Sequence, residues 1–445
     1  MRHARLMMQL WRKPPCWDSK LVCYALNAMI LEALAMQHLP HNKSLPPAYR
    51  PSARPQTTLL AASLLAVAFL LGGCAAKKDH VDPPAPLKEF VASVSTQDVW
   101  SYGMGSADRN AQLSLTPWVG RAAGGSVLVA TDARGQVIAF DSRTGEQRWR
   151  AELGFAVAGG VGGGGDKVIV TGLRGEVAAL DLSNGTLLWK ADIGSVVNAP
   201  AAVGSLSIAV RTADGRLVVL NSSNGERLWS DARPVPPLSL QGTSQPILMQ
   251  DAVLAGFDNG DFTAYELGSG RRLFTVNVAL PSGRNDVERM VDVDSSPLFD
   301  RGIIYALAYQ GRLVAIDAAT AQVVWATKMS GFSNITLDTT AIYLTDANSH
   351  LLAVDRRTGR TLWSQDALHA RGVSAPLVLN GQLIVGDKEG YVHWFATEDG
   401  RMLARTRAAN SAIPRAPVSD GERIFIEARE GRIVAFTSSG TTTRK

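Results

Sequence analysis

The stretch Gly135–Trp149, GQVIAFDSRTGEQRW, returns several times along the chain with small changes. Forty residues later it becomes GEVAALDLSNGTLLW, and after a further forty residues GRLVVLNSSNGERLW. Each copy consists of a turn glycine, an apolar run with β-branched residues, a second turn that ends in glycine, and a segment with tryptophan. This order predicts a β-hairpin whose outer strand bears the aromatic side chain.

Eight copies of the first turn can be counted in the 445-residue sequence. The intervals between them are 40, 40, 45, 51, 38, 41 and 41 residues. Two further short apolar runs lie between successive hairpins, as in 199–212 and 375–387, so each unit supplies four strands. A period of about 42 residues with four strands is typical of a β-propeller blade. The turns centre on Gly135, Gly175, Gly215, Gly260, Gly311, Ser349, Gly390 and Gly431.

We therefore expect an all-β fold over residues 97–440, an eight-bladed β-propeller of four-stranded antiparallel blades. One blade cannot bury both faces of its sheet, whereas eight blades stacked in a ring can. The eighth copy has no tryptophan strand after it, and Trp100 stands five residues before Gly105, as Trp149 stands before Gly154. An N-terminal strand around 97–105 is thus expected to close the ring and cover an open edge. The alternative is that Trp100 is an exposed residue of a tether.

The aromatic residue of each outer strand is a candidate for packing between blades. Its recurrence at one position of the repeat favours such packing over a cofactor site. The seventh copy departs from the pattern, because Ala404 occupies this position. The aromatic residues expected to dock one blade on the next are Trp100, Trp149, Trp189, Trp229, Phe274, Trp325 and Trp363.

The basic character of the chain comes from its N-terminal part. The formal net charge is +5, but residues 1–73 hold eight of the 45 Lys and Arg residues and two of the 40 acidic residues. The remainder has 37 basic and 38 acidic residues, which gives no electrostatic case for binding nucleic acid. The three cysteines, at 16, 23 and 74, all precede the repeats, which excludes a disulfide framework or a cysteine nucleophile within them.

A lipoprotein signal peptide is expected over residues 55–73. The apolar run 59–71 is too short to span a bilayer as a helix and has the composition of a secretory signal. It leads into Leu-Gly-Gly-Cys74, which resembles the bacterial lipobox, in which the cysteine becomes lipidated. An ordinary signal peptide with a chance cysteine is the alternative.

The sequence also supports predictions for the segments before and after this signal. By resemblance to bacterial lipoproteins, Ala75 after the cysteine favours export to the outer membrane. Residues 74–96 contain Pro83, Pro84 and Pro86 and are expected to form a lipidated, extended tether. Residues 1–54 resemble no structural element, and we expect the true translation start to lie after them.

No catalytic or metal site emerges from the motifs. The glycine-rich segment 159–167 lacks the Gly-Lys-Ser/Thr of a phosphate loop and precedes an apolar strand, so it is interpreted as a turn. His350, His369 and His393 have no spacing that indicates metal binding. Asp292 and Asp294 would share one face of a strand, but without a neighbouring base, contact with solvent or a partner is favoured over acid–base chemistry. No cofactor is expected.

An enzyme nevertheless stays open as the second hypothesis. The pattern AxDxxTGxxxW resembles the tryptophan-docking motif of pyrroloquinoline-quinone propellers, which include dehydrogenases. Many of those enzymes have adjacent cysteines and a calcium site around the quinone, and the repeats of this chain contain no cysteine. The motif builds a scaffold and does not by itself make an active site.

The two longest intervals between repeats point to a binding surface. They contain 231–246 and 280–297, and each falls between the outer strand of one blade and the inner strand of the next. In a propeller these connections leave the ring on the same face, so they are expected to be neighbours and to bind a partner. Leu238, Leu240 and Met290 are apolar residues in these loops, where solubility gains nothing from them. Loop growth without function is the alternative.

The loop motifs resemble those of one family. The lipobox, the eight blades, LSLQG, RMVDVDSSP, ALAYQG and GDKEGYVHW are together similar to the BamB family of outer-membrane assembly lipoproteins, over about 74–437. The resemblance implies a non-enzymatic scaffold on the periplasmic face of the outer membrane. Such a scaffold binds the POTRA domains of BamA, assists the insertion of β-barrel proteins and extends its contacts to unfolded outer-membrane proteins.

Residue positions for this binding follow from the same resemblance. The family's contact positions correspond to Leu238 and Leu240 of LSLQG and to Asp292 and Asp294 of VDVD, and Arg289 belongs to the same expected surface. The family commonly has arginine where this chain has Gln241, which removes one charged contact.

Overall fold

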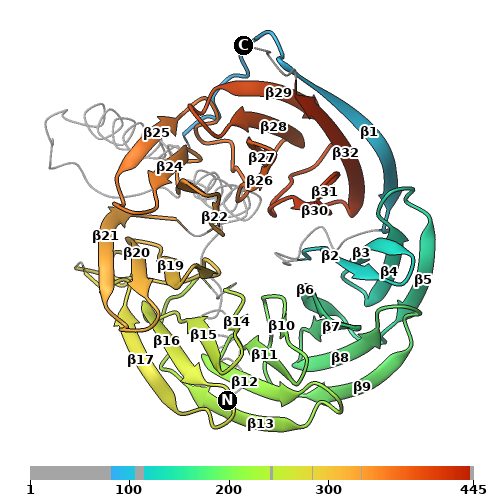
Figure 1. Ribbon diagram of the computed structural model, residues 1–445, viewed down its shortest axis with the longest axis vertical. Helices are drawn as coiled ribbons and strands as arrows, with labels where there is room; N and C mark the ends of the chain where they lie inside the picture. The colour runs from blue at the N-terminus through green and yellow to red at the C-terminus, as the bar shows by residue number, and fades with distance from the viewer. Residues whose placement is uncertain (1–81, 106–114, 241–243, 283, 332, 441–445) are drawn as a thin grey trace, which may run out of the picture. The chain divides into compact units, whose positions relative to one another are not determined.

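The computed structural model describes residues 82–105, 115–240, 244–282, 284–331 and 333–440. Their strands form eight four-stranded antiparallel sheets around a central axis (Figure 1). No helix occurs in the described residues, and none of them forms a helical span that could cross a membrane. The predicted eight-bladed β-propeller is thus confirmed. Residues 1–54, the expected signal peptide at 55–73 and Cys74 lie outside the described residues.

The first four blades follow one another along the chain, each running from its inner to its outer strand. Blades one and two comprise β2 (Trp118–Ala122), β3 (Gly125–Thr131), β4 (Gln136–Asp141), β5 (Gln147–Glu152), β6 (Val157–Gly164), β7 (Lys167–Gly172), β8 (Glu176–Asp181) and β9 (Leu187–Asp192). Blades three and four comprise β10 (Ala202–Val203), β11 (Ser207–Arg211), β12 (Arg216–Asn221), β13 (Arg227–Ala232), β14 (Ile247–Leu248), β15 (Ala252–Gly256), β16 (Asp261–Glu266) and β17 (Arg272–Asn277).

The remaining blades repeat this order, except that the last one takes its outer strand from the other end of the propeller. Blades five and six comprise β18 (Leu298–Asp300), β19 (Ile303–Leu307), β20 (Gly311–Asp317), β21 (Val323–Met329), β22 (Thr336–Leu337), β23 (Ala341–Thr345), β24 (Leu351–Asp355) and β25 (Thr361–Gln365). Blades seven and eight comprise β26 (Leu377–Leu379), β27 (Gln382–Gly386), β28 (Tyr391–Ala396), β29 (Met402–Arg407), β30 (Val418–Ser419), β31 (Ile424–Glu427), β32 (Arg432–Gly440) and β1 (Val94–Gly103).

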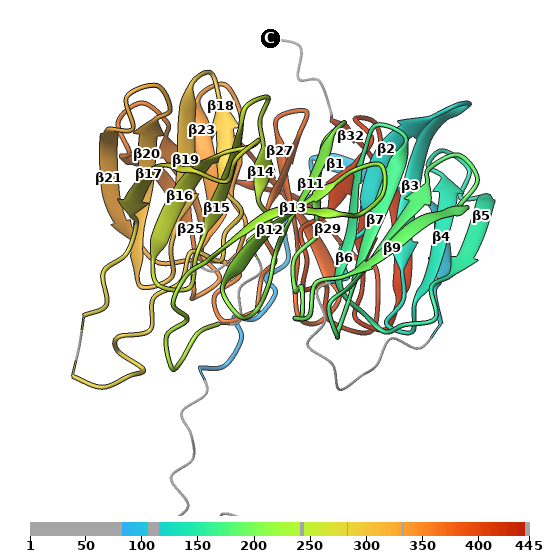
Figure 2. The same ribbon diagram turned by 90° about the horizontal axis from the view of Figure 1, so that it is seen from below.

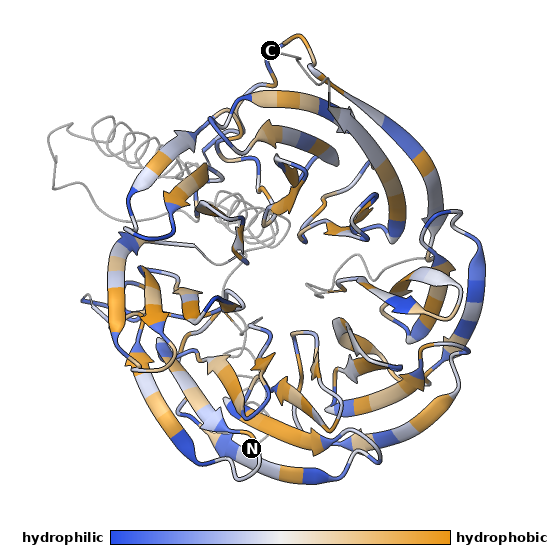
Figure 3. Ribbon diagram, in the orientation of Figure 1, coloured by the Kyte–Doolittle hydropathy of each residue, from blue (hydrophilic) through white to orange (hydrophobic). Residues whose placement is uncertain are grey.

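The hydrophobic core lies between adjacent blades. Val129 and Val137 of blade one, for example, pack in one cluster with Val168 and Val170 of blade two, and all four are fully buried. Each such side chain contributes about 1.5–3 kcal/mol by leaving water. Figure 3 shows the apolar segments recurring in blade after blade around the ring. Both faces of each middle strand are therefore covered, as a propeller requires.

The tryptophan of an outer strand contacts the hairpin turn of the next blade. In blade one, Nε1 of Trp149 donates a hydrogen bond to the carbonyl oxygen of Leu182 in blade two, at 2.8 Å. Gly185 of that turn has a positive φ of 74°, and a Cβ there would lie 2.5 Å from the Trp149 ring. The corresponding bonds elsewhere join Trp100 to Ser142, Trp189 to Ser222, Trp229 to Leu267, Trp325 to Arg356 and Trp363 to Thr397.

The interface between blades seven and eight has Ala404 at the tryptophan position, and the interface between blades four and five also lacks this contact. The outer strand there has Phe274, whose ring has no N–H donor, and the facing turn has Ala321 where the other turns have glycine. Ala321 has a φ of 58°, which costs a residue with a Cβ roughly 1–2 kcal/mol. The absence of a tryptophan ring over the turn therefore removes the steric demand for glycine.

In the eighth blade, β1 is the outer strand and pairs antiparallel with β32. Val94 lies opposite Gly440 and Gly103 opposite Arg432, with a bulge between Asp98 and Trp100. Nε1 of Trp100 donates to the Ser142 carbonyl oxygen of blade one at 3.0 Å. The two ends of the propeller are thereby joined within one sheet.

The segment that precedes β1 is held against blades six and seven. The Ala85 N–H donates to the His369 carbonyl oxygen at 2.9 Å, and the Ser93 N–H donates to the Leu403 carbonyl oxygen at 2.9 Å. Leu87 packs against the core between these blades. The extended tether expected over 74–96 is therefore bound to the propeller from residue 82 onward, which corrects the boundary at 97.

Candidate docking surface

Two long connections lie side by side on one face of the propeller. The first long connection, residues 233–246, links β13 to β14, and the second, residues 278–297, links β17 to β18. Because the four strands of a blade alternate in direction, every connection from an outer strand to the next inner strand leaves the ring on the same face. The second long connection projects from that face (Figure 2).

Three hydrogen bonds tie the two long connections to each other. The Leu240 N–H donates to Oδ2 of Asp292 at 3.2 Å. The Ser244 hydroxyl donates to the Ser295 carbonyl oxygen at 3.4 Å, and the Gln245 N–H donates to the Ser296 hydroxyl oxygen at 2.9 Å. The two connections therefore form one surface, as the positions of the long intervals predict.

Exposed apolar side chains gather on these connections. Leu238 and Leu240 are 42% and 37% exposed, and Met290 is partly buried. Sequence reasoning missed three further residues of this kind, which are Val235, Leu280 and Val287. Their signal was present, because each is a large aliphatic residue in a connection where a polar residue would be expected. Several apolar side chains exposed to water on neighbouring loops indicate a binding site.

Asp292 and Asp294 lie beneath this surface and not on it. Asp292 is fully buried and Asp294 is 3% exposed, so neither carboxylate reaches a partner in this conformation. The expectation of direct contact is therefore corrected. The backbone explains the burial, because the Tyr309 N–H donates to the Asp292 carbonyl oxygen at 2.8 Å and draws this segment against blade five.

A buried charge cluster surrounds Asp292. Arg211, at the end of β11, forms an ion pair with Asp258 of the β15–β16 turn, and their side chains are 3% and 2% exposed. Burial and the negative charge of Asp294 raise the pKa of Asp292 to about 7, against the opposing effects of Arg211 and the Leu240 N–H. Burial lowers the pKa of Arg211, while the charges of Asp292 and Asp294 raise it. Arg211 thus faces the carboxyl groups of Asp258, Asp292 and Asp294, and the charge of Asp294 also acts on Arg415.

The remaining site predictions concern Arg289, which the structure describes, and Gln241, which it does not. Arg289 is exposed in the second long connection, next to a turn in which Oδ1 of Asn285 accepts the Glu288 N–H at 2.9 Å. Arg289 is therefore free of burial and available to a partner. Gln241 lies outside the described residues.

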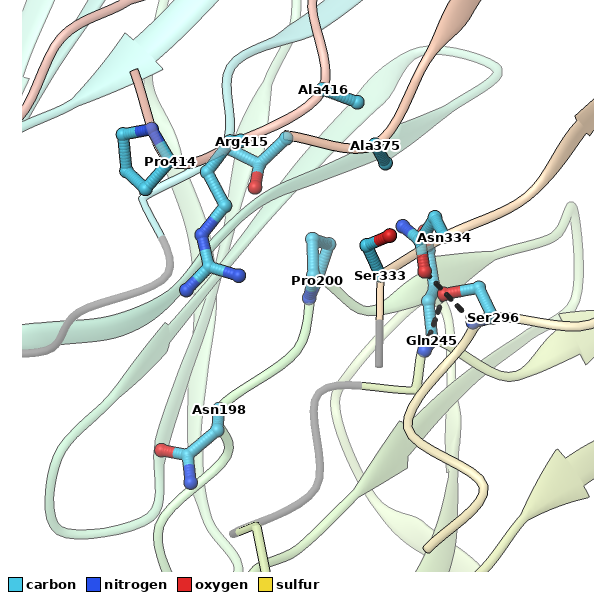
Figure 4. Close-up of a pocket in the computed structure, with 11 residues that line it drawn as sticks. Asn198, Pro200, Gln245, Ser296, Ser333, Asn334, Ala375, Pro414, Arg415 and Ala416 are labelled. Atoms are coloured by element: carbon cyan, nitrogen blue, oxygen red, sulfur yellow. Dashed lines mark hydrogen bonds between the residues drawn. The ribbon is translucent and has the colours of Figure 1, made fainter. Parts of the chain in front are cut away.

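The centre of the ring contains a small polar cavity of about 100 Å³ (Figure 4). Gln245, Ser296 and Asn334 lie together on one side of it, and the Asn334 side-chain oxygen accepts the Ser296 N–H at 2.8 Å. Arg415 extends from the other side, and burial, together with the charge of Arg429, lowers its pKa to about 10. Gln245 also donates to the Ala201 carbonyl oxygen at 3.0 Å. These bonds link the inner ends of neighbouring blades.

The three candidate histidines form hydrogen bonds with other side chains of the propeller. His393 is buried, and its Nε2 lies 3.0 Å from Oδ2 of Asp387; burial lowers its pKa. His350 and His369 lie with ring nitrogens 3.0 Å apart. Within the described ranges, no three His, Cys, Asp or Glu side chains are grouped so that they could hold a metal ion.

The blade contacts and the ring of eight sheets define the class of this protein, an eight-bladed β-propeller docked by tryptophans. The family model described as outer membrane protein assembly factor BamB matches residues 133–365 and 348–443. A curated relative with that name, from Alkalilimnicola ehrlichii, is 46% identical over 372 residues, which cover 84% of this chain and 95% of the relative. The chain belongs to the BamB family.

Solved structures agree with this assignment at the level of the fold. The crystal structure of BamB from Moraxella catarrhalis matches with a TM-score of 0.70 and 23% identity, covering 77% of this chain and all of that one. The quinohemoprotein alcohol dehydrogenase of Comamonas testosteroni matches with a TM-score of 0.61 but only 13% identity, covering 77% of this chain and 76% of that one. The likeness to quinone dehydrogenases is thus confined to the fold, and the chain is not an enzyme of that class.

Proposed function

We propose that this protein is a lipid-anchored scaffold on the periplasmic face of the outer membrane that binds the POTRA domains of BamA. By holding those domains it would assist the insertion of β-barrel proteins. One observation carries the proposal. The two long connections are tied together and present Leu238 and Leu240 on one face, in segments where the chain resembles the contact motifs of its family.

The chemistry of the surface favours apolar anchoring. Val235, Leu238, Leu240, Leu280 and Val287 are all more than a third exposed. Central apolar anchors that become fully desolvated typically provide most of the energy of an interface. With Gln241 in place of the family's arginine, charge contributes less, so raising the salt concentration should weaken binding only modestly.

Anchoring to the membrane would depend on Cys74. A single acyl chain holds a protein only marginally, whereas the two or three chains of a processed lipoprotein cysteine give durable attachment. Replacing Cys74 with Ser should leave the propeller folded and move it to the soluble periplasmic fraction, or leave its signal uncleaved. A variant that still fractionates as a processed outer-membrane lipoprotein would contradict this assignment.

The decisive experiment is co-purification with BamA from solubilised outer membranes. Leu240→Asp should abolish it, because a charge at an apolar anchor costs about 2 kcal/mol or more of binding energy. Leu228→Asp is the matched control, since Leu228 is a 48% exposed leucine near the start of β13, whereas the first long connection follows the end of that strand. Thr358→Asp, in the β24–β25 turn on the opposite face, is a second control. Normal binding by Leu240→Asp, with loss in either control, would place the surface elsewhere.

Unfolded outer-membrane proteins are a further proposed partner. The exposed leucines on the long connections are suited to extended apolar segments. Binding of an unfolded β-barrel protein to the purified scaffold, competed by POTRA domains, would support a shared surface. Binding that Leu240→Asp leaves unchanged would show that such substrates use another part of the protein.

A further inference from the structure

The first long connection is held by interactions that extend inward to an ion pair buried in the propeller. Arg211 ends β11 in blade three, and Asp258 follows β15 in blade four. Their ion pair joins the two blades, and the charges of Asp292 and Asp294 in the second long connection act on Arg211. Neither Arg211 nor Asp258 belongs to either connection, and neither is exposed enough to touch a partner.

The segment of Asp292 packs against the blade-four turn that holds Asp258, and its side chain reaches the first long connection. The backbone of its segment is fixed from both sides, because the Val293 N–H donates to the Phe257 carbonyl oxygen at 3.2 Å and the Tyr309 N–H donates to that of Asp292 at 2.8 Å. The side chain points to the first long connection, where Oδ2 accepts the Leu240 N–H at 3.2 Å. The carboxylate therefore holds the backbone of an exposed leucine from below.

The charge of Arg211 favours the ionised form of Asp292 and so strengthens the hydrogen bond from the Leu240 N–H. Arg211 lies among three buried carboxyl groups, those of Asp258, Asp292 and Asp294, and buried like charges suppress each other's ionisation. An ionised carboxylate accepts a backbone N–H roughly twice as strongly as a neutral group. Without Arg211, the carboxyl groups would bind a proton, and the Leu240 N–H would lose its charged acceptor. Arg415 also acts on Asp294 from the centre of the ring.

We propose that Arg211 and Asp258 are positioning residues for the docking surface, which fix the Leu240 backbone through Asp292 without touching the partner. This inference rests on the proposed function and adds to it the residues that preorganise the contact. Preorganisation matters because a loop that is already ordered loses less entropy on binding.

The propeller offers a matched control at the other side of the ring. Arg371 is also 3% exposed and pairs with the fully buried Asp387 at 2.8 Å and with Glu389 at 2.6 Å. These residues belong to blades six and seven and contact neither long connection. Arg371→Gln therefore removes a buried arginine in a similar setting, so it reports the general cost of such a change.

The test measures two quantities on the full mature protein carrying Arg211→Gln, Asp258→Asn or Arg371→Gln. The first is hydrogen exchange at the Leu240 amide, which reports its bond to Asp292 without any partner. The second is affinity for purified BamA POTRA domains. Arg211→Gln should speed Leu240 exchange and weaken binding by about tenfold or more, which corresponds to 1.4 kcal/mol. Arg371→Gln should change neither quantity, although both arginine variants lose stability.

The results that would overturn the positioning role of Arg211 and Asp258 are as follows. A folded Arg211→Gln protein with wild-type Leu240 exchange and wild-type affinity would overturn the inference. If Arg211→Gln does not fold, Asp258→Asn gives the same two readouts, because it removes the partner that holds Arg211 in place; wild-type values in that variant would equally overturn it. If the wild-type protein does not bind POTRA domains, the proposed function fails, and the Leu240 exchange still decides whether the positioning is real.

Discussion

The interface between blades one and two and the interface between blades four and five join neighbouring sheets in different ways. The first uses Trp149, whose indole bonds to Leu182 and covers Gly185. The second has Phe274 and Ala321 at these positions, and the second long connection supplies bonds from Asp292 and Val293 to the flanking blades instead. The regular contact is missing in the β20–β21 turn, on the face opposite to the proposed docking surface, while the second long connection joins the same two blades on the docking face. Blade docking and partner docking therefore draw on different residues and can be separated experimentally.

The largest effect is expected where a tryptophan-docked interface depends on a strand from the other end of the propeller. Deleting residues up to 106 removes β1 and Trp100, whereas deleting up to 90 removes only part of the segment before it. The longer deletion should lower the free energy of unfolding by more than the 3–5 kcal/mol typical of a buried Trp→Ala change, because an edge is also exposed. Denaturant unfolding of both truncations measures the difference. Equal stabilities would show that β1 is dispensable.

A single substitution tests the comparison between the two interfaces directly. Trp149 is 6% exposed and donates a hydrogen bond, whereas Phe274 is only partly buried. Trp149→Ala should therefore cost about 3–5 kcal/mol, and Phe274→Ala clearly less. Urea unfolding of the two variants would show it. A Phe274→Ala cost as large as that of Trp149→Ala would mean that the second long connection contributes little to this interface.

The turns facing these aromatic residues should respond in opposite directions. Gly185→Ala places a Cβ against the Trp149 ring and keeps a positive φ, so it should destabilise the protein. Ala321→Gly relieves a left-handed backbone without losing a ring contact, and should stabilise it by about 1 kcal/mol. Thermal unfolding of the two variants provides the measurement. Destabilisation by Ala321→Gly would indicate that its methyl group packs against Phe274.

The smallest effect concerns pH. The folded-state pKa of Asp292, about 7, lies above its unfolded value, so its contribution to stability is present at low pH and is lost as the pH rises through 7. The hydrogen bond that Asp292 accepts from the Leu240 N–H becomes stronger as the pH rises, because only the ionised carboxylate is a charged acceptor. Leu240 protection should thus rise from about pH 6 to 8 while the melting temperature falls slightly. Asp292→Asn should flatten both curves, and a pH-independent Leu240 protection in the wild type would contradict this.

The sequence predicted the architecture well because the signals that specify a blade are local. The turn at Gly135, the apolar strand after it and Trp149 lie within fifteen residues, and the pattern repeats eight times. The eight-bladed ring is confirmed for this reason. The proximity of the two long connections was also predictable, since the alternation of strand directions fixes the face on which they emerge.

The interior of the proposed docking surface was not predictable in the same way. Asp292 and Asp294 lie in an apparently polar loop motif, and only the hydrogen bond from Tyr309 shows that this segment is drawn inward. Arg211 is one charged residue at a strand end, and its partner Asp258 stands in another blade. Pairings of this kind depend on three-dimensional packing between blades, which leaves no periodic trace in the sequence. For the same reason, the binding of residues 82–93 to blades six and seven could not be foreseen.

The pairing of β1 with β32 has a consequence for the time course of folding. Val94 and Gly440 belong to one sheet although nearly the whole propeller separates them along the chain. Closing a loop of this length costs entropy that no local contact repays in advance. Because the chain is synthesised from its N-terminus, β1 is complete long before β32, and its edge stays unpaired until that last strand is made. Protection of the β1 amides should therefore appear last in refolding, when the pairing of β1 with β32 closes the ring.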